Sequence, residues 1–152
     1  MDILIAKPFI RAVTDVLGTM AMITPKAGAP YVKKDHTAKG DVSGVIGLTG
    51  AVNGTLSVTF TKTCAVAVVK NMLGGDIQDL LSDVKDGVGE LTNMISGQAR
   101  KWLAESGTIL QSSTPTVVMG ANHSIAHLAK SPIMAVPFTT EFGDFTIEIS
   151  LE

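Results

Sequence analysis

Apolar residues recur every three or four positions in three segments of the chain, a spacing that predicts three helices. The first helix covers residues 6–22, and its apolar side chains fall on one face: Phe9, Val13, Val16, Leu17 and Met20. The second has Thr63 as a candidate N-cap and ends at the glycine pair 74–75, because glycine favours the left-handed conformation that closes a helix. The longest covers about 82–106 and is followed by Gly107.

Other segments alternate polar and apolar residues with a period of two, which predicts strands. Residues 40–49 and 55–60 form one predicted pair, joined by Asn53-Gly54, a strong hairpin signal. We expect one side of the second strand to face water, because polar and apolar residues alternate cleanly along it. Gly44 and Gly47 are expected to bend the first strand.

The C-terminal part of the chain returns to strand-like patterns. Residues 108–119 are predicted to be extended, with Pro115 restricting them to a sheet edge or a bulge. A loop is expected over 120–131, followed by a hairpin of residues 133–141 and 145–151. Consecutive hairpins with helices set apart indicate an α+β fold, in which helices pack on an antiparallel sheet.

Size and composition place this fold in one domain. The chain has 152 residues, 45% of them hydrophobic and 17% charged, which is enough to bury a full core. No repeat or linker divides it, so residues 1–152 are expected to form a single domain. A net charge of −2 without a basic run argues against nucleic-acid binding.

The cysteine content and the N-terminus indicate a cytoplasmic protein. Cys64 is the one cysteine, so no internal disulfide forms, and we expect it to be a buried structural thiol. The N-terminus lacks the basic, apolar and small-residue regions of a signal peptide. No apolar stretch reaches the roughly 20 residues that span a bilayer, so no membrane partner is expected.

The longest predicted helix carries polar residues in a line. Asp86, Glu90, Asn93 and Gly97 follow i, i+4, i+7, i+11 spacing, which places them along one side, and Arg100 extends the line. The opposite side forms an apolar stripe of Val84, Val88, Leu91, Ile95, Ala99 and Trp102. The first set is therefore expected to point away from the core.

Three glycines interrupt this helix, although each interior glycine costs about 1 kcal/mol relative to alanine. Gly97 lies one turn beyond Asn93, and Gly87 and Gly89 flank the region of Glu90. We interpret the glycines as positions that keep the helix surface free of side chains, so that a partner can approach the backbone and dock. The alternative is an ordinary solvated face, since any amphipathic helix has one.

The motif Asp86-x3-Glu90-x2-Asn93-x3-Gly97 resembles the signature helix of the CheC/CheX/FliY family of chemotaxis phosphatases. The similarity extends along nearly the whole chain. It includes Pro8-Phe9-Ile10, the 40–60 hairpin, the segment from Pro115 to Gly120 and the closing hairpin. CheC-type members carry two such helices, whereas the first helix here has Asp15 but no Glu/Asn pair. The resemblance therefore favours the single-site CheX type and implies a homodimer.

The resemblance implies a phosphatase acting on the aspartyl-phosphate of a CheY-like response-regulator receiver. In that reaction Asn93 would orient the attacking water, a task that suits a carboxamide because it donates, accepts and does not titrate. The resemblance implies that Glu90 pairs with the conserved lysine of the receiver and that Mg²⁺ belongs to the receiver. No motif in this chain suggests a cofactor or a metal site of its own. Asp86, Gly97 and Arg100 are expected to contribute to docking; the alternative for Asp86 is that it serves the start of the helix, where acidic residues are favoured.

Two alternatives remain open on the sequence. The same fold could dock receivers or flagellar-switch components without catalysis. A small-molecule enzyme is less consistent with the sequence, because no nucleophile and base are apparent. His123 and His127 are four residues apart, as two metal ligands on a helix would be, but nothing nearby completes a site. We expect both histidines to lie in a loop or on the surface.

Overall fold

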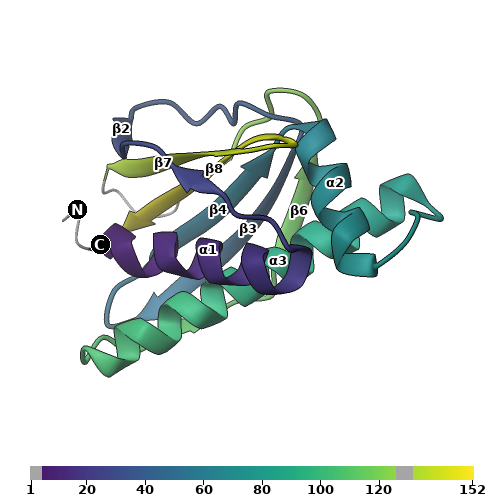
Figure 1. Ribbon diagram of the computed structural model, residues 1–152. Coiled ribbons are helices and arrows are strands. Elements are labelled where there is room, and N and C mark those ends of the chain that lie inside the picture. The colour runs from purple at the N-terminus through teal and green to yellow at the C-terminus, as the bar shows by residue number, and fades with distance from the viewer. Residues whose placement is uncertain (1–4, 126–131) are drawn as a thin grey trace.

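The structure is a computed structural model that describes residues 5–125 and 132–152. Within these residues, three helices lie against one antiparallel sheet (Figure 1). The helices are α1 (Ala6–Ala21), α2 (Lys62–Leu73) and α3 (Leu80–Glu105). The strands are β1 (Lys26–Ala27), β2 (Tyr31–Lys33), β3 (Val42–Gly50), β4 (Gly54–Phe60), β5 (Leu110–Ser112), β6 (Thr116–Met119), β7 (Ile133–Thr140) and β8 (Gly143–Leu151). The predicted α+β class is confirmed.

The two predicted hairpins, β3–β4 and β7–β8, form the centre of the sheet. They meet through β4 and β8, giving the strand order β1-β7-β8-β4-β3-β5. The short strands extend the two sides: β2 also pairs with β7, and β6 also pairs with β3. β3 pairs with β4 without interruption through Gly44 and Gly47, so these glycines do not break the ladder as a bend would suggest.

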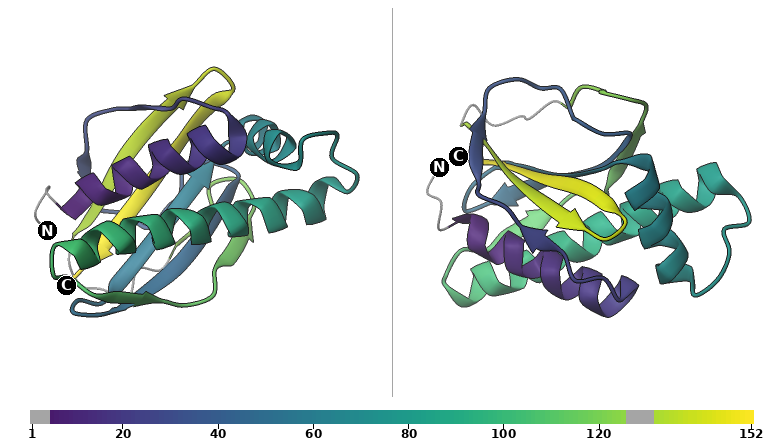
Figure 2. Two further views of the ribbon diagram at one scale, coloured as in Figure 1. Left: turned by 60° about the horizontal axis from the view of Figure 1, so that its bottom comes forward. Right: turned by 45° about the horizontal axis from the view of Figure 1, so that its top comes forward.

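The helices cover one face of this sheet. α1 and α3 lie side by side across it, and α2 packs near one end of both (Figure 2). Alternate strand residues point toward the helices and form the core, which includes stacked rings of Phe138 and Phe145 with centroids 4.8 Å apart. Burial of these apolar side chains is the main force holding the helices to the sheet.

The ends of α2 correct one prediction and confirm another. The N-cap is Thr61, whose Oγ1 accepts from the backbone N–H of Cys64 at 3.3 Å, so the helix starts earlier than a Thr63 cap would allow. Gly74 closes the helix with φ of 70°, as the glycine pair predicted. None of the helices in the described ranges is long and apolar enough to cross a membrane.

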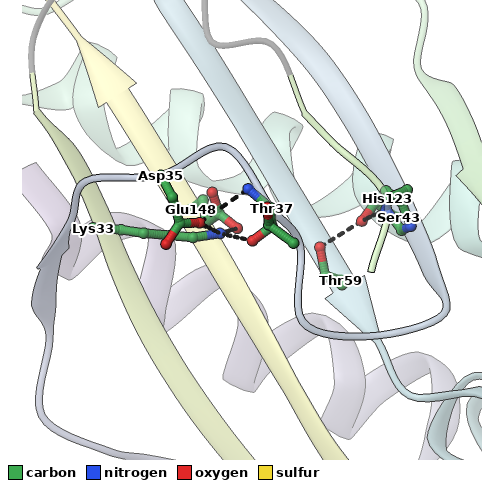
Figure 3. A network of polar contacts seen from close by, with 7 residues as sticks. All are labelled: Lys33, Asp35, Thr37, Ser43, Thr59, His123 and Glu148. Atoms are coloured by element: carbon green, nitrogen blue, oxygen red, sulfur yellow. Dashed lines mark hydrogen bonds and ion pairs between the residues drawn. The ribbon is translucent and has the colours of Figure 1, made fainter. Parts of the chain in front are cut away.

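The helix-free face of the sheet is polar but buried, which contradicts the prediction of a wet side for β4. Every residue of β4 is buried, including Thr55, Ser57 and Thr59. Two connecting segments, 33–38 and 120–125, lie over this face and pair with each other (Figure 3). Alternation correctly separated the two faces, but it carries no information about chain segments that cover a polar face.

Two buried polar contacts anchor these covering segments. The Lys33 ammonium lies 3.0 Å from a Glu148 carboxylate oxygen, and both side chains are buried. His123 Nε2 lies 2.6 Å from Ser43 Oγ, which in turn contacts the Thr59 hydroxyl (Figure 3). His123 Nδ1 lies 2.6 Å from the Gly120 carbonyl, and a carbonyl only accepts, so Nδ1 carries the hydrogen.

Candidate functional site

α3 carries all the predicted site residues on a single rigid element. Its N-cap is Asp79, whose carboxylate accepts from the Ser82 N–H at 3.1 Å. Asp83 accepts from the N–H groups of Gln78 and Asp79, at 3.1 and 3.2 Å. The helix has 26 residues and is therefore about 39 Å long. Its buried residues run from Val84 to Leu103, so one side is packed along most of the helix and the other side is left for solvent or a partner.

The inner side of α3 is buried against α1 and the sheet. Its buried residues are Val84, Val88, Gly89, Leu91, Thr92, Ile95, Ser96, Ala99 and Leu103. Trp102 was predicted in this stripe, but it is only partly buried. The Arg11 guanidinium of α1 lies over its ring, 3.9 Å from the centroid. Trp102 therefore sits at the edge of the core.

The outer side carries the predicted line of polar residues. Asp86, Glu90 and Asn93 are exposed, and Gly97 and Arg100 are partly buried. Glu90 and Asn93 are three residues apart and therefore neighbours on the helix surface. Within the described residues, neither side chain makes a hydrogen bond or an ion pair. Both polar groups are therefore available to a partner.

The glycines of α3 serve different purposes, and only Gly97 fits the interpretation that they keep the surface free of side chains for a partner. A methyl group at Gly87 would lie 2.7 Å from Val69 Cγ2, so this glycine allows α2 and α3 to approach closely. Gly89 is buried, and a methyl group there would lie 3.4 Å from Val117 of β6. At Gly97 the nearest atom would be a guanidinium nitrogen of Arg100 at 3.8 Å, which leaves the helix surface open.

A shallow depression borders Glu90 between α3 and β6. It has a volume of about 440 Å³ and is lined by Lys85, Asp86, Gly89, Glu90, Pro115, Thr116 and Val117. A larger depression, of about 600 Å³, lies elsewhere, beside β5, and contains none of the predicted site residues. Sequence reasoning missed the contribution of β6 to the surface around Glu90. Helical periodicity identifies residues that share a face, but not the strand beside that face.

Arg100 does not project straight outward from the line. Its Nε donates to Ser96 Oγ at 3.3 Å, one turn back along the helix. The guanidinium therefore lies beside the bare backbone of Gly97.

The residues considered for other chemistry do not assemble a second site. His123 lies in a loop, as predicted, with both ring nitrogens engaged, while His127 falls outside the described residues. Burial raises the pKa of the Cys64 thiol, which keeps it neutral and unreactive. In residues 5–125 and 132–152, no three His, Cys, Asp or Glu side chains gather to hold a metal ion.

Comparisons with known proteins agree on one family. The sequence matches the family described as chemotaxis phosphatase CheX over residues 42–139. A chemotaxis protein CheX from Desulfovibrio desulfuricans is 61% identical, and its crystal structure matches with a TM-score of 0.93 over 97% of this chain and 99% of that one. The CheY-P phosphatase CheX of Thermotoga maritima is 30% identical, covering 100% of this chain and 98% of that protein.

A third relative has been solved with a partner. It is the CheX of Borrelia burgdorferi, in a CheX–CheY–BeF3–Mg²⁺ complex, and it shares this fold with a TM-score of 0.81. The identity is 23%, with 96% of each chain covered. At that identity the likeness shows the fold alone.

Proposed function

The chain belongs to the CheX family of chemotaxis phosphatases, and on this premise we propose that it hydrolyses the aspartyl-phosphate of a CheY-like receiver. The observation that carries the proposal is the pair Glu90 and Asn93, exposed and unbonded on one face of a long, well-anchored helix. The Thermotoga maritima relative bears the name of this activity. The Borrelia burgdorferi relative binds CheY in its complex.

Asn93 positions the attacking water in this proposal. Hydrolysis of an acyl phosphate needs little covalent chemistry from the protein, because the main requirement is a water held in line with the leaving oxygen. The carboxamide accepts a hydrogen bond from that water through its oxygen and donates another through its nitrogen. Asn93 is exposed on the outer side of α3, so in this proposal the helix inserts it into the active site of the receiver.

Glu90 anchors the receiver instead of acting as a base. A carboxylate that faced the phosphoryl group would be repelled by its negative charge. One turn away from Asn93, it pairs with the lysine of the receiver's active site. Mg²⁺ belongs to the receiver, whose phosphorylated site it neutralises. The catalytic centre is therefore completed only when the two proteins meet.

The remaining residues of the line contribute to docking. Asp86 adds negative charge beside Glu90 at the rim of the depression against β6. Gly97 lets the receiver approach the helix backbone, and Arg100 supplies a positive group at the far end of the line. We also propose that the protein acts as a homodimer, which light scattering of the purified chain would test.

The decisive experiment follows phosphate loss from a phosphorylated CheY-like receiver in Mg²⁺ buffer, with and without this protein. The wild type should accelerate the loss, and Asn93→Ala should reduce kcat by about 100-fold, the scale expected when a reacting group is misplaced. If the wild type gives no acceleration while still binding the receiver, the protein is a docking module and the phosphatase proposal fails. Full activity in Asn93→Ala would remove the water-positioning role.

Glu90→Ala separates anchoring from catalysis in the same assay. It should raise KM by about tenfold while leaving kcat near the wild-type value at saturating receiver, because an anchor acts mainly on binding. Glu90→Gln is the matched control, since it keeps the shape and removes the charge. An unchanged KM in both variants would contradict the anchoring role.

A further inference from the structure

On the inner side of α3, at the residue that precedes Asn93, the helix touches the sheet at one unusually close contact. Gly44 of β3 faces the helix, and a methyl group there would lie 1.9 Å from Thr92 Oγ1 and 2.8 Å from Thr92 Cβ. Both distances are far shorter than the 3.5–4.0 Å of ordinary non-bonded contact. Only glycine fits at this position, so the β3 backbone and the Thr92 side chain pack directly on each other. We call this contact the Gly44–Thr92 seat.

Both partners of the seat are held in place. Thr92 is 0% exposed, and its hydroxyl donates to the Val88 carbonyl at 2.8 Å, which fixes the side-chain rotamer. Gly44 is paired on both sides, with Val58 of β4 and Val117 of β6. The helix therefore rests on a fixed point of the sheet through a side chain that has no freedom to move.

The seat adjoins the proposed catalytic residue. Thr92 immediately precedes Asn93 in the helix, and Thr92 is buried whereas Asn93 is exposed. Side-chain tips lie about 5–6 Å from a helix axis, so a rotation of about 10° moves the Asn93 carboxamide by about 1 Å. A displacement of that size can cost about 100-fold in rate.

We propose that the Gly44–Thr92 seat is a positioning device for the reaction, because it sets the rotation of α3 and thereby the place of the Asn93 carboxamide in the receiver. This inference rests on the proposed function. Gly44 and Thr92 touch no substrate and act through Asn93. Glu90 is less sensitive to the seat, because its longer side chain reaches its partner by adjusting its own torsions.

The test combines Gly44→Ala, Thr92→Ala and the double variant. Gly44→Ala should lower kcat by about 100-fold and change KM by less than about threefold, while the circular dichroism spectrum stays native. Thr92→Ala alone should lower kcat by about tenfold, because the helix loses its spacer on the sheet. In the double variant Oγ1, the nearest atom at 1.9 Å, and Cγ2, at 3.3 Å, are gone, while Cβ remains at 2.8 Å, so the clash is relieved in part. It should recover at least about tenfold over Gly44→Ala, a non-additivity that independent sites do not show.

Gly47→Ala is the matched control on the same strand. A methyl group there would meet only the end of the Ser113 side chain, at 3.3 Å, so kcat should stay within about twofold of wild type. A folded Gly44→Ala protein with wild-type kcat would overturn the inference. If Gly44→Ala fails to fold, Thr92→Ala tests the positioning role instead, because this variant introduces no clash and should still show a lower kcat. A wild-type kcat in Thr92→Ala would then overturn the inference.

A crystal structure of Gly44→Ala, or of Thr92→Ala if the first variant does not fold, tests the effect of the seat on helix orientation independently of the phosphatase activity. In it, α3 should be rotated or displaced by about 1 Å at residue 93 relative to the sheet. An unmoved helix refutes the seat whatever the activity. If the helix moves but the wild type has no phosphatase activity, the proposed function fails and the seat stands only as a determinant of helix orientation, without the catalytic role proposed for it.

Discussion

The two sides of α3 differ in how much room their residues have. On the inner side, a single added methyl group at Gly44 or Gly87 would lie within 2.7 Å of a neighbouring side chain. On the outer side, a methyl group at Gly97 would have 3.8 Å to its nearest neighbour, and Glu90 has no bonded partner among the described residues. The inner side is fixed by the fold, whereas the outer side is open to a partner.

Because of this difference, substitutions on the two sides of the same helix should have different effects. Changes on the inner side act first on stability and on the orientation of α3. Changes on the outer side meet no packing clash in the isolated protein, and their main effect is expected on receiver binding. The two effects are measured separately, the first by unfolding and the second by receiver kinetics.

The largest contrast in stability is expected between Leu91 and Asn93, which are two residues apart on opposite sides of the helix. Leu91 is 0% exposed in the core, so Leu91→Ala should cost about 2–5 kcal/mol through lost burial and a cavity. Asn93→Ala should change the free energy of unfolding by less than about 0.5 kcal/mol. Urea denaturation of both variants measures this, and similar losses in the two would contradict the division of the helix.

Particular residues show how far the sequence alone predicted this arrangement. Periodicity placed Leu91 inside and Glu90 and Asn93 outside, and hairpin signals predicted the central strands, all of which the structure confirms. It could not show that β4 is covered on both faces, because alternation does not reveal the segments lying over a strand. The chemical roles of Glu90 and Asn93 stay predictions, since they depend on a second protein.

The glycines illustrate the same limit. A helical wheel gives the direction of Gly87 but not the helix packed against it, so its contact with Val69 could not be foreseen. The wheel placed Gly97 on the open side, and the structure agrees. Tertiary contacts therefore decide whether a glycine in a helix serves packing or clearance.

Gly87→Ala should destabilise the protein by about 1 kcal/mol. Overpacking against Val69, at 2.7 Å, costs about 1–3 kcal/mol, and the better helix propensity of alanine offsets about 1 kcal/mol of it. Val69→Ala in the same chain should remove the clash and make the pair of changes less than additive in denaturation experiments. A stabilised Gly87→Ala protein would show that the α2–α3 contact is looser than the inner side requires.

Gly97→Ala should have the opposite sign. With 3.8 Å to the nearest atom, the methyl group fits, and the helix gains up to about 1 kcal/mol in stability. The same methyl group should weaken receiver binding, because it holds the partner away from the backbone. Thermal unfolding and a titration with BeF3-activated receiver measure the two effects on one sample. A variant that is more stable and binds equally well would remove Gly97 from the docking surface.

Arg100→Ala is expected to cost the isolated protein about 1 kcal/mol or less, because it loses one long hydrogen bond, 3.3 Å from Arg100 Nε to the buried Ser96 Oγ. Its influence should appear in association. A charge at the edge of an interface acts mainly on the association rate and its salt dependence. Removing Arg100 should therefore slow receiver binding at low salt and flatten the dependence of the rate on salt, as stopped-flow mixing would measure.

Arg100→Lys is the matched control, since it keeps the charge and should keep most of the salt dependence. The guanidinium also occupies the space beside Gly97, so Arg100→Ala and Gly97→Ala should be coupled in receiver affinity, whereas Arg100→Ala and Asp86→Ala, at opposite ends of the line, should be additive. Coupling across the whole line instead would mean that the receiver contacts α3 as one cooperative unit. Arg100 would then be part of the docking surface itself and not a charge at its edge.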